Sequence, residues 1–119
     1  MMTSALCVSL MLCHEMDAVQ RREWRMLPLL NLIRDDALAH RVFTALHIPL
    51  YVALLTGLAA EWAGRPGELR AGFDVFAIIH LGLHIAYTRH RENAFAGALS
   101  WSLIAGAALA GALDLWRIG

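Results

Sequence analysis

The chain has 119 residues, of which 59% are hydrophobic and 17% are charged, and its mean hydropathy is +0.54. Soluble globular domains are typically about 45–50% apolar and about 25% charged, so this composition excludes an ordinary soluble domain, a coiled coil and a disordered chain. Ten basic and ten acidic residues leave no net charge, which removes the basic surface that a nucleic-acid-binding protein needs. We therefore predict a small integral membrane protein without a nucleic-acid partner.

Four stretches of the chain are long and apolar enough to cross a bilayer, which takes about 20 residues of helix. Residues 42–60 and 94–113 contain no Asp, Glu, Lys or Arg. The first stretch ends in a polar turn, and the third carries Arg70 and Asp74 near its start. We predict an all-α fold, an integral membrane four-helix bundle that forms a single transmembrane domain over residues 1–119. Its helices are expected at approximately 1–19, 41–62, 69–88 and 94–116.

The start of the chain and the three connections between the predicted helices differ in composition. We expect residues 1–13 to remain part of the first helix, because they have neither the basic start nor the cleavage site of a secretory signal. Residues 20–36 are rich in Arg, Trp and Leu, which is typical of a segment in the lipid headgroup region. Residues 61–68 contain Gly64, Pro66 and Gly67 and are expected to form a turn. The third connection, 89–93, is short and basic.

The arginines predict the orientation of the protein, because basic residues concentrate on the cytoplasmic side of membrane proteins. All ten basic residues are Arg. Only Arg65, Arg70 and Arg117 lie on the side of the termini. The other seven flank the first and third connections: Arg21, Arg22, Arg25, Arg34, Arg41, Arg89 and Arg91. This asymmetry places both connections in the cytoplasm and both termini outside it.

Histidines from three helices are expected at one depth in the membrane. His80 and His84 are four residues apart, so both imidazoles lie on one helix face and can reach a single ion. His14 lies near the inner end of the first helix, and His47 lies about 10 Å further into the membrane than His40. Ionisable groups inside a bilayer are costly and mostly face a site or each other. We predict a metal site drawn from His14, Asp17, His47, His80 and His84.

The simpler interpretation of any one of these histidines is a hydrogen bond to a backbone carbonyl or a hydroxyl. His40 and His90 lie among surface arginines and are expected to be interfacial. Asp74 is expected to be interfacial or to pair with Arg70. A stripe of small residues on the fourth helix would allow close helix packing and is the expected interface of a homodimer; it consists of Ala98, Ser102, Gly106 and Ala110.

Several motifs extend over nearly the whole chain. They are HEMDAVQRREWRMLP at residues 14–28, HIPL at 47–50, GFD at 72–74 and HLGLH at 80–84. With these motifs the chain resembles a family of small bacterial four-helix integral membrane proteins of unknown function. The resemblance implies a four-helix membrane fold and a shared polar site, but no reaction. We expect the protein to lie in the bacterial inner (plasma) membrane. The implied site residues are His14, Glu15, Asp17, Glu23, His47, His80 and His84. Some members of the family are expected to have His where this chain has Arg22, so Arg22 is a poor candidate ligand.

The leading functional hypothesis is a membrane-embedded metalloenzyme. Three histidines and one carboxylate suit Zn²⁺ or non-haem iron. With zinc, Glu15 or Glu23 would act as general base in the hydrolysis of a lipid-like substrate; with iron, a lipid or quinone would be oxidised. Membrane lipid is the expected surrounding partner. The alternatives are a haem- or pigment-binding or accessory subunit of a larger membrane complex, and a structural membrane protein whose polar cluster only holds helices together.

Overall fold

The structure is a computed structural model and describes residues 1–65 and 68–118. It contains the helices α1 (Met2–Gln20), α2 (Asp36–Trp62), α3 (Leu69–Ala86) and α4 (Ala98–Ile118), all four long and apolar enough to cross a membrane. Three short 3-10 helices lie in the connections: η1 (Glu23–Arg25), η2 (Leu30–Leu32) and η3 (Tyr87–Arg89). The described residues include no strand. The predicted all-α membrane bundle is confirmed.

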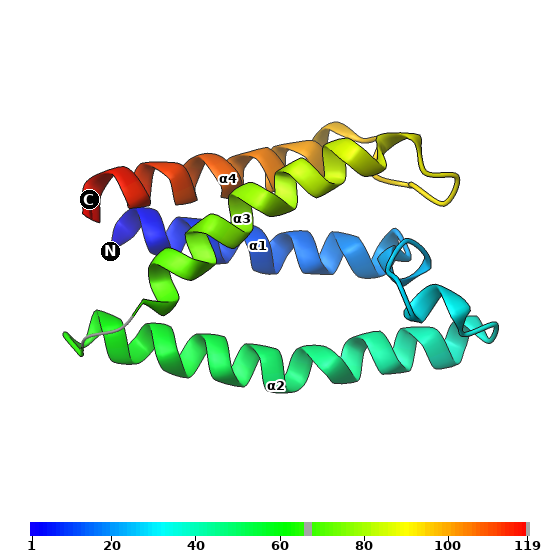
Figure 1. Cartoon of the computed structure of the whole chain (residues 1–119), viewed down its shortest axis with the longest axis horizontal. Coiled ribbons are helices and arrows are strands. Elements are labelled where there is room, and N and C mark those ends of the chain that lie inside the picture. The colour runs from blue at the N-terminus through cyan, green and yellow to red at the C-terminus, as the bar shows by residue number, and fades with distance from the viewer. Residues whose placement is uncertain (66–67, 119) are drawn as a thin grey trace.

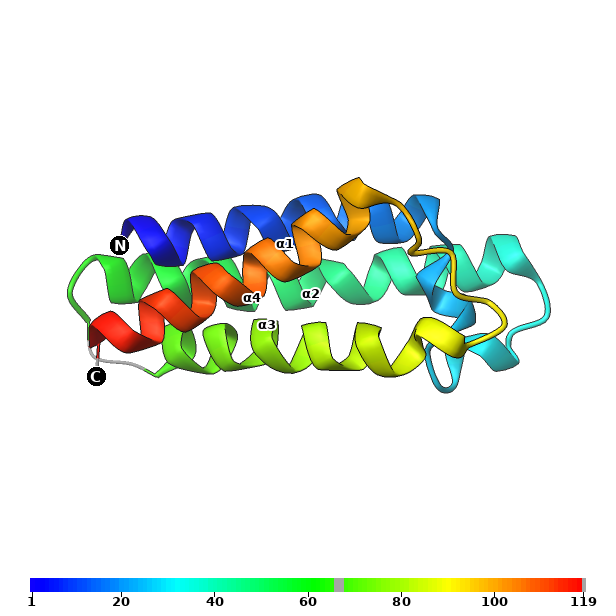
Figure 2. The ribbon, with the colours of Figure 1, turned by 90° about the horizontal axis from the view of Figure 1, so that it is seen from above.

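The four helices pack unequally. Both α1 and α3 pack along α4, whereas α2 lies apart from α1 and approaches α3 near the turn that joins them (Figure 1). Figure 2 shows α4 running obliquely between α1 and α3. The two chain termini lie at one end of the bundle, and the first and third connections lie together at the other end (Figure 1). We call the latter the connection end.

Two helix starts differ from the expected positions. Helix α2 begins at Asp36 because the Asp35 side chain caps it, accepting hydrogen bonds from the backbone N–H groups of Ala37 at 2.9 Å and Leu38 at 3.2 Å. Helix α4 begins at Ala98, because residues 94–97 follow a turn in which the Asn93 side chain accepts a hydrogen bond from the Phe95 N–H at 3.1 Å. Within the expected turn at 61–68, residues 66–67 lie outside the described part of the chain.

The segment between α1 and α2 folds back against the helices instead of extending from them. Arg22 has a left-handed backbone, with φ of 55° and ψ of 47°, and Leu29 also has a positive φ, of 73°, with ψ of −48°. The indole N–H of Trp24 donates to the Asp36 carboxylate at 2.9 Å, and Arg25 donates to the same carboxylate at 2.7 Å. These bonds attach η1 to the start of α2 and hold the adjacent Glu23 against the bundle.

At the terminus end, Arg70 pairs with a partner that sequence spacing did not suggest. Its guanidinium makes two hydrogen bonds of 2.6 Å to the fully buried Asp114 on α4, which also accepts from the Thr3 hydroxyl. Asp74, the expected partner, is instead buried against Gly111 of α4. A Cβ at Gly111 would lie 3.0 Å from the Asp74 carbonyl oxygen. The glycine therefore permits the close approach of α3 and α4.

Candidate metal centre

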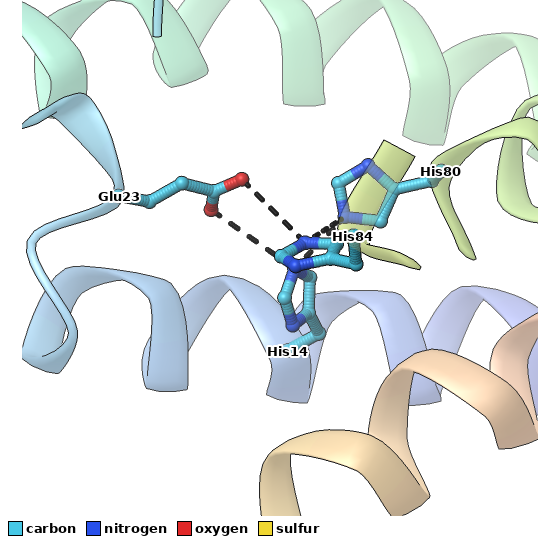
Figure 3. Close-up of side chains that lie close together, drawn as sticks. All are labelled: His14, Glu23, His80 and His84. Atoms are coloured by element: carbon cyan, nitrogen blue, oxygen red, sulfur yellow. Dashed lines mark hydrogen bonds and ion pairs between the residues drawn. The ribbon is translucent and has the colours of Figure 1, made fainter. Parts of the chain in front are cut away.

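Three imidazoles meet near the connection end of the bundle, each through its Nε2 atom. Nε2 of His80 lies 2.9 Å from Nε2 of His14 and 3.1 Å from Nε2 of His84. Figure 3 shows the three rings, from α1 and α3, converging with the Glu23 carboxylate directed at them. His14 is fully buried, and His80 and His84 are 9% and 5% exposed. We call His14, Glu23, His80 and His84 the His–Glu cluster; its four candidate ligand atoms all lie within 4.8 Å of one another.

The spacing of these nitrogens suits one small cation better than hydrogen bonds among the rings. Zn–N distances of about 2.0–2.1 Å in tetrahedral geometry separate pairs of ligand atoms by about 3.3 Å. The two nitrogen–nitrogen distances at His80 are close to this value. Nε2 of a neutral imidazole carries either one proton or one lone pair, so His80 can make one good hydrogen bond while it faces two nitrogens. A cation among the three nitrogens would satisfy all of them.

Glu23 completes the cluster from the connecting segment. Its carboxylate oxygens lie 4.0 Å from Nε2 of His14 and 3.8 Å from Nε2 of His84, slightly further than the nitrogens lie from one another. Burial raises the pKa of Glu23 to about 8, with a further contribution from the negative charges of Glu15 and Asp17. An ionised carboxylate at this position is therefore stabilised by a nearby positive charge, which a bound cation would supply.

Aromatic side chains pack against all three imidazoles of the cluster. Phe95, which is 1% exposed, contacts the rings of His14 and His84, with centroids 5.5 Å and 4.6 Å away. Phe76 contacts the ring of His80 at 5.4 Å. The Nδ1 atom of His14 is buried and makes no hydrogen bond within the described part of the chain. The rings are therefore positioned mainly by packing rather than by hydrogen bonds to their outer nitrogens.

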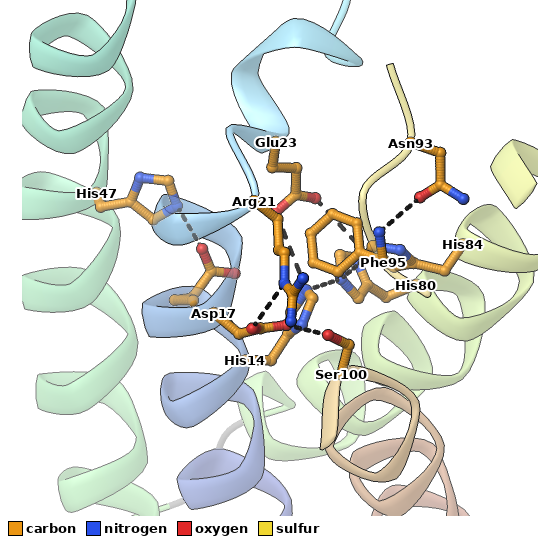
Figure 4. Close-up of polar contacts among 11 residues, drawn as sticks. His14, Asp17, Arg21, Glu23, His47, His80, His84, Asn93, Phe95 and Ser100 are labelled. Carbon is orange, nitrogen blue, oxygen red and sulfur yellow. Dashed lines mark hydrogen bonds and ion pairs between the residues drawn. The ribbon is translucent and has the colours of Figure 1, made fainter. Parts of the chain in front are cut away.

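Two of the five predicted ligands lie outside the His–Glu cluster. Asp17 accepts a hydrogen bond of 2.5 Å from the Ser100 hydroxyl of α4 and one of 3.2 Å from Arg21. His47 lies on α2, apart from the other imidazoles (Figure 4), where its Nε2 is 3.1 Å from the Glu15 carboxylate. The structure thus brings together His14, His80 and His84 of the predicted ligands, and adds Glu23, which was expected as a general base.

A cavity of about 260 Å³ opens beside the His–Glu cluster. Glu23, His80 and His84 form its polar wall. The remaining lining is mostly apolar and comes from the segment between α1 and α2, from α3 and from η3; it consists of Met26, Leu27, Pro28, Leu83 and Tyr87. Three of the four residues of the His–Glu cluster thus line a cavity that suits a small molecule with an apolar body.

These features define a small four-helix membrane protein with a buried His–Glu cluster beside an apolar cavity. The chain belongs to a family of unknown function, DUF6713, which matches residues 1–118. This match confirms the resemblance to a family of small four-helix proteins of unknown function. No curated protein and no solved structure matches the chain.

Proposed function

We propose that the protein binds one divalent metal ion, zinc or iron, through Nε2 of His14, His80 and His84, with Glu23 as the fourth ligand or as a general base. The observation that carries this proposal is the convergence of three Nε2 atoms, which come from two helices and lie 2.9 Å and 3.1 Å apart at His80. Three imidazoles with one further position are a common ligand set of catalytic zinc. Asp17 and His47, which are bonded elsewhere, are not required.

We further propose that the site is catalytic and acts on a lipid-like substrate. A metal ion bound in this way supplies a Lewis acid and an activated water. The Glu23 carboxylate is slightly further from the imidazoles than they are from one another, which is compatible with its accepting a proton from that water. The mainly apolar cavity beside Glu23, His80 and His84 supports a substrate with a hydrocarbon portion.

The location that fits this proposal is the inner, or plasma, membrane of a bacterium, with the connection end in the cytoplasm. Seven of the ten arginines lie in or beside the two connections, and the positive-inside rule orients such an end toward the cytoplasm. The His–Glu cluster would then lie at the cytoplasmic side of the membrane. A substrate would enter from the inner leaflet or from its interface with water.

Metal analysis of protein purified without a His tag tests the proposal. We expect about one equivalent of zinc or iron in the wild-type protein and less than about a tenth in a His80→Asn/His84→Asn double variant. The matched control is His40→Asn, because His40 is an exposed histidine of α2 outside the cluster. Wild-type protein that stays below a tenth of an equivalent after incubation with zinc, iron, manganese or copper would contradict metal binding.

The same samples distinguish metal binding from the two alternatives, a haem-binding subunit and a purely structural protein. A haem held by two axial histidines needs their nitrogens on opposite faces of the macrocycle, whereas Nε2 of His14 and Nε2 of His80 are 2.9 Å apart. A Soret band in the absorption spectrum would nevertheless favour a haem-binding subunit. A purely structural role predicts that the double variant loses stability while the wild type holds no metal.

A further inference from the structure

A second cavity separates α2 from α1 and α3. Its volume is about 390 Å³, which lies in the range of about 300–1,000 Å³ that is usual for small-molecule sites. Leu54, Phe73 and Phe76 contribute apolar walls from α2 and α3. Glu15, His47 and Tyr51 are the polar residues of the lining. Residues of α1, α2 and α3 line the cavity, and α2 approaches α3 near the turn that joins them (Figure 1).

The polar residues of this cavity form a pair that is neutral overall. Nδ1 of His47 lies 2.7 Å from the Phe43 carbonyl oxygen, so this nitrogen donates and carries a proton. Nε2 of His47 lies 3.1 Å from the Glu15 carboxylate. A hydrogen bond there needs one proton between the two atoms, because two facing lone pairs would repel. The pair of Glu15 and His47 therefore has no net charge, whichever atom holds that proton.

The polar groups remain available to a ligand. The side chains of Glu15 and His47 are each 20% exposed, and both line the cavity. The Tyr51 hydroxyl makes no hydrogen bond to any other described residue, although the ring contacts His47 with centroids 5.5 Å apart. A ligand oxygen could thus accept from Tyr51 or exchange hydrogen bonds with the Glu15–His47 pair.

The charges around the cavity argue against an anionic ligand. No arginine is among the described residues that line it, and the chain contains no lysine. A fatty-acid carboxylate or a phosphate would lie beside Glu15 with no cation other than His47, whose proton is already shared with Glu15, and an unpaired anion is costly inside a membrane. A neutral head that carries a carbonyl or hydroxyl oxygen meets no such penalty.

We propose that this cavity binds one neutral amphiphile, such as a quinone or a long-chain alcohol, with its oxygen-bearing head at Glu15, His47 and Tyr51. Its ring or chain lies against Leu54, Phe73 and Phe76. The seven residues of helix from His47 to Leu54 span about 10 Å, enough for the start of a hydrocarbon tail. This site goes beyond the proposed metal function, because no member of the His–Glu cluster lines the cavity.

Two glycines of α3 provide a matched pair of variants. Gly72 lines the cavity, and a Cβ built there meets nothing within 4 Å. A Cβ at Gly82 also meets nothing within 4 Å, but Gly82 does not line this cavity. Gly72→Phe should therefore fill the cavity without a backbone clash, while Gly82→Phe adds the same side chain elsewhere on the same helix. Ala53→Phe fills the cavity from α2 and replaces Gly72→Phe if that variant fails to fold.

The test measures binding of decylubiquinone, dodecanol and dodecanoate to the purified full-length protein by native mass spectrometry over a concentration series. We expect one molecule of decylubiquinone or of dodecanol per chain, and at least a tenfold loss of affinity in Gly72→Phe but not in Gly82→Phe. Tyr51→Phe should weaken binding about five- to tenfold, the value of one hydrogen bond. The neutral probe that binds more tightly shows whether the site prefers a quinone or a long-chain alcohol.

Other outcomes would overturn the inference. These are tighter binding of dodecanoate, the absence of saturable binding by both neutral probes, and equal binding by Gly72→Phe and the wild type. A dimer with a helix of the second copy cross-linked into the cavity would also overturn it. When the His80→Asn/His84→Asn changes are also present, Gly72→Phe should still bind the neutral probes more weakly than Gly82→Phe does. Failure of the metal proposal and failure of this one can therefore be distinguished.

Discussion

Replacing His84 by Asn should weaken metal binding by about a hundredfold. Nε2 of His84 is 3.1 Å from Nε2 of His80 and 3.8 Å from the Glu23 carboxylate, so this ring faces both neighbours in the cluster. Four-ligand zinc sites in small peptides bind with about 10–16 kcal/mol. One ligand of four therefore contributes about 3 kcal/mol, and each 1.4 kcal/mol is about tenfold in affinity.

The assay is competition for zinc against a chromophoric chelator of known affinity, with detergent-solubilised protein that carries no His tag. Glu23→Gln should weaken binding less, by about tenfold, because the amide oxygen is a poorer ligand and lacks the negative charge. His40→Asn should bind as the wild type does. Unchanged affinity in His84→Asn, or an equal loss in His40→Asn, would refute the assignment of the three Nε2 atoms as ligands.

Three further predictions concern packing, charge pairing and protons. Asp114→Ala should cost about 2 kcal/mol of stability in a detergent unfolding titration, because it removes the buried partner of the partly exposed Arg70. Gly111→Ala should cost about 2 kcal/mol by overpacking α3 against α4, while Gly82→Ala, with open space around its Cβ, should cost nothing in the same titration. Metal binding at pH 7 should release about one proton more from the wild type than from Glu23→Gln, as calorimetry in two buffers would measure, because the Glu23 pKa is about 8 and the bound form is deprotonated. Metal affinity should accordingly rise with pH up to about 8 and rise less steeply above it.

Helix periodicity and depth were sufficient to predict most of the His–Glu cluster. His80 and His84 share a face because four residues of helix turn by little more than one revolution. This relation depends on one helix alone and needs no knowledge of how the helices pack. His14 could be added because its depth along the first helix matches theirs. Two of the four spans followed from the lengths of neutral stretches, and the other two from stretches that are mainly apolar but carry polar residues near one end.

Depth alone could not decide which histidines meet, because it carries no information about which neighbour a helix faces. His47 was expected in the site, but α2 lies apart and turns this ring toward Glu15. Asp17 lies three residues after His14, yet its carboxylate is bonded to Ser100 of α4, a contact between distant parts of the chain. The position of Glu23 depends on the left-handed backbone of Arg22, for which the sequence offers no glycine as a signal.

His14 and Glu15 are consecutive in α1, so their side chains point about 100° apart around the helix axis. One belongs to the His–Glu cluster and the other to the cavity between α1, α2 and α3. Helix α1 thus lies between the two sites. A rotation of α1 about its axis by about 10° would move side-chain atoms at a radius of about 5 Å by nearly 1 Å in both sites. Metal coordination tolerates only about 0.2 Å. If both proposed ligands bind, filling either site would restrict the rotation of α1, and any effect of one ligand on the affinity for the other would be reciprocal.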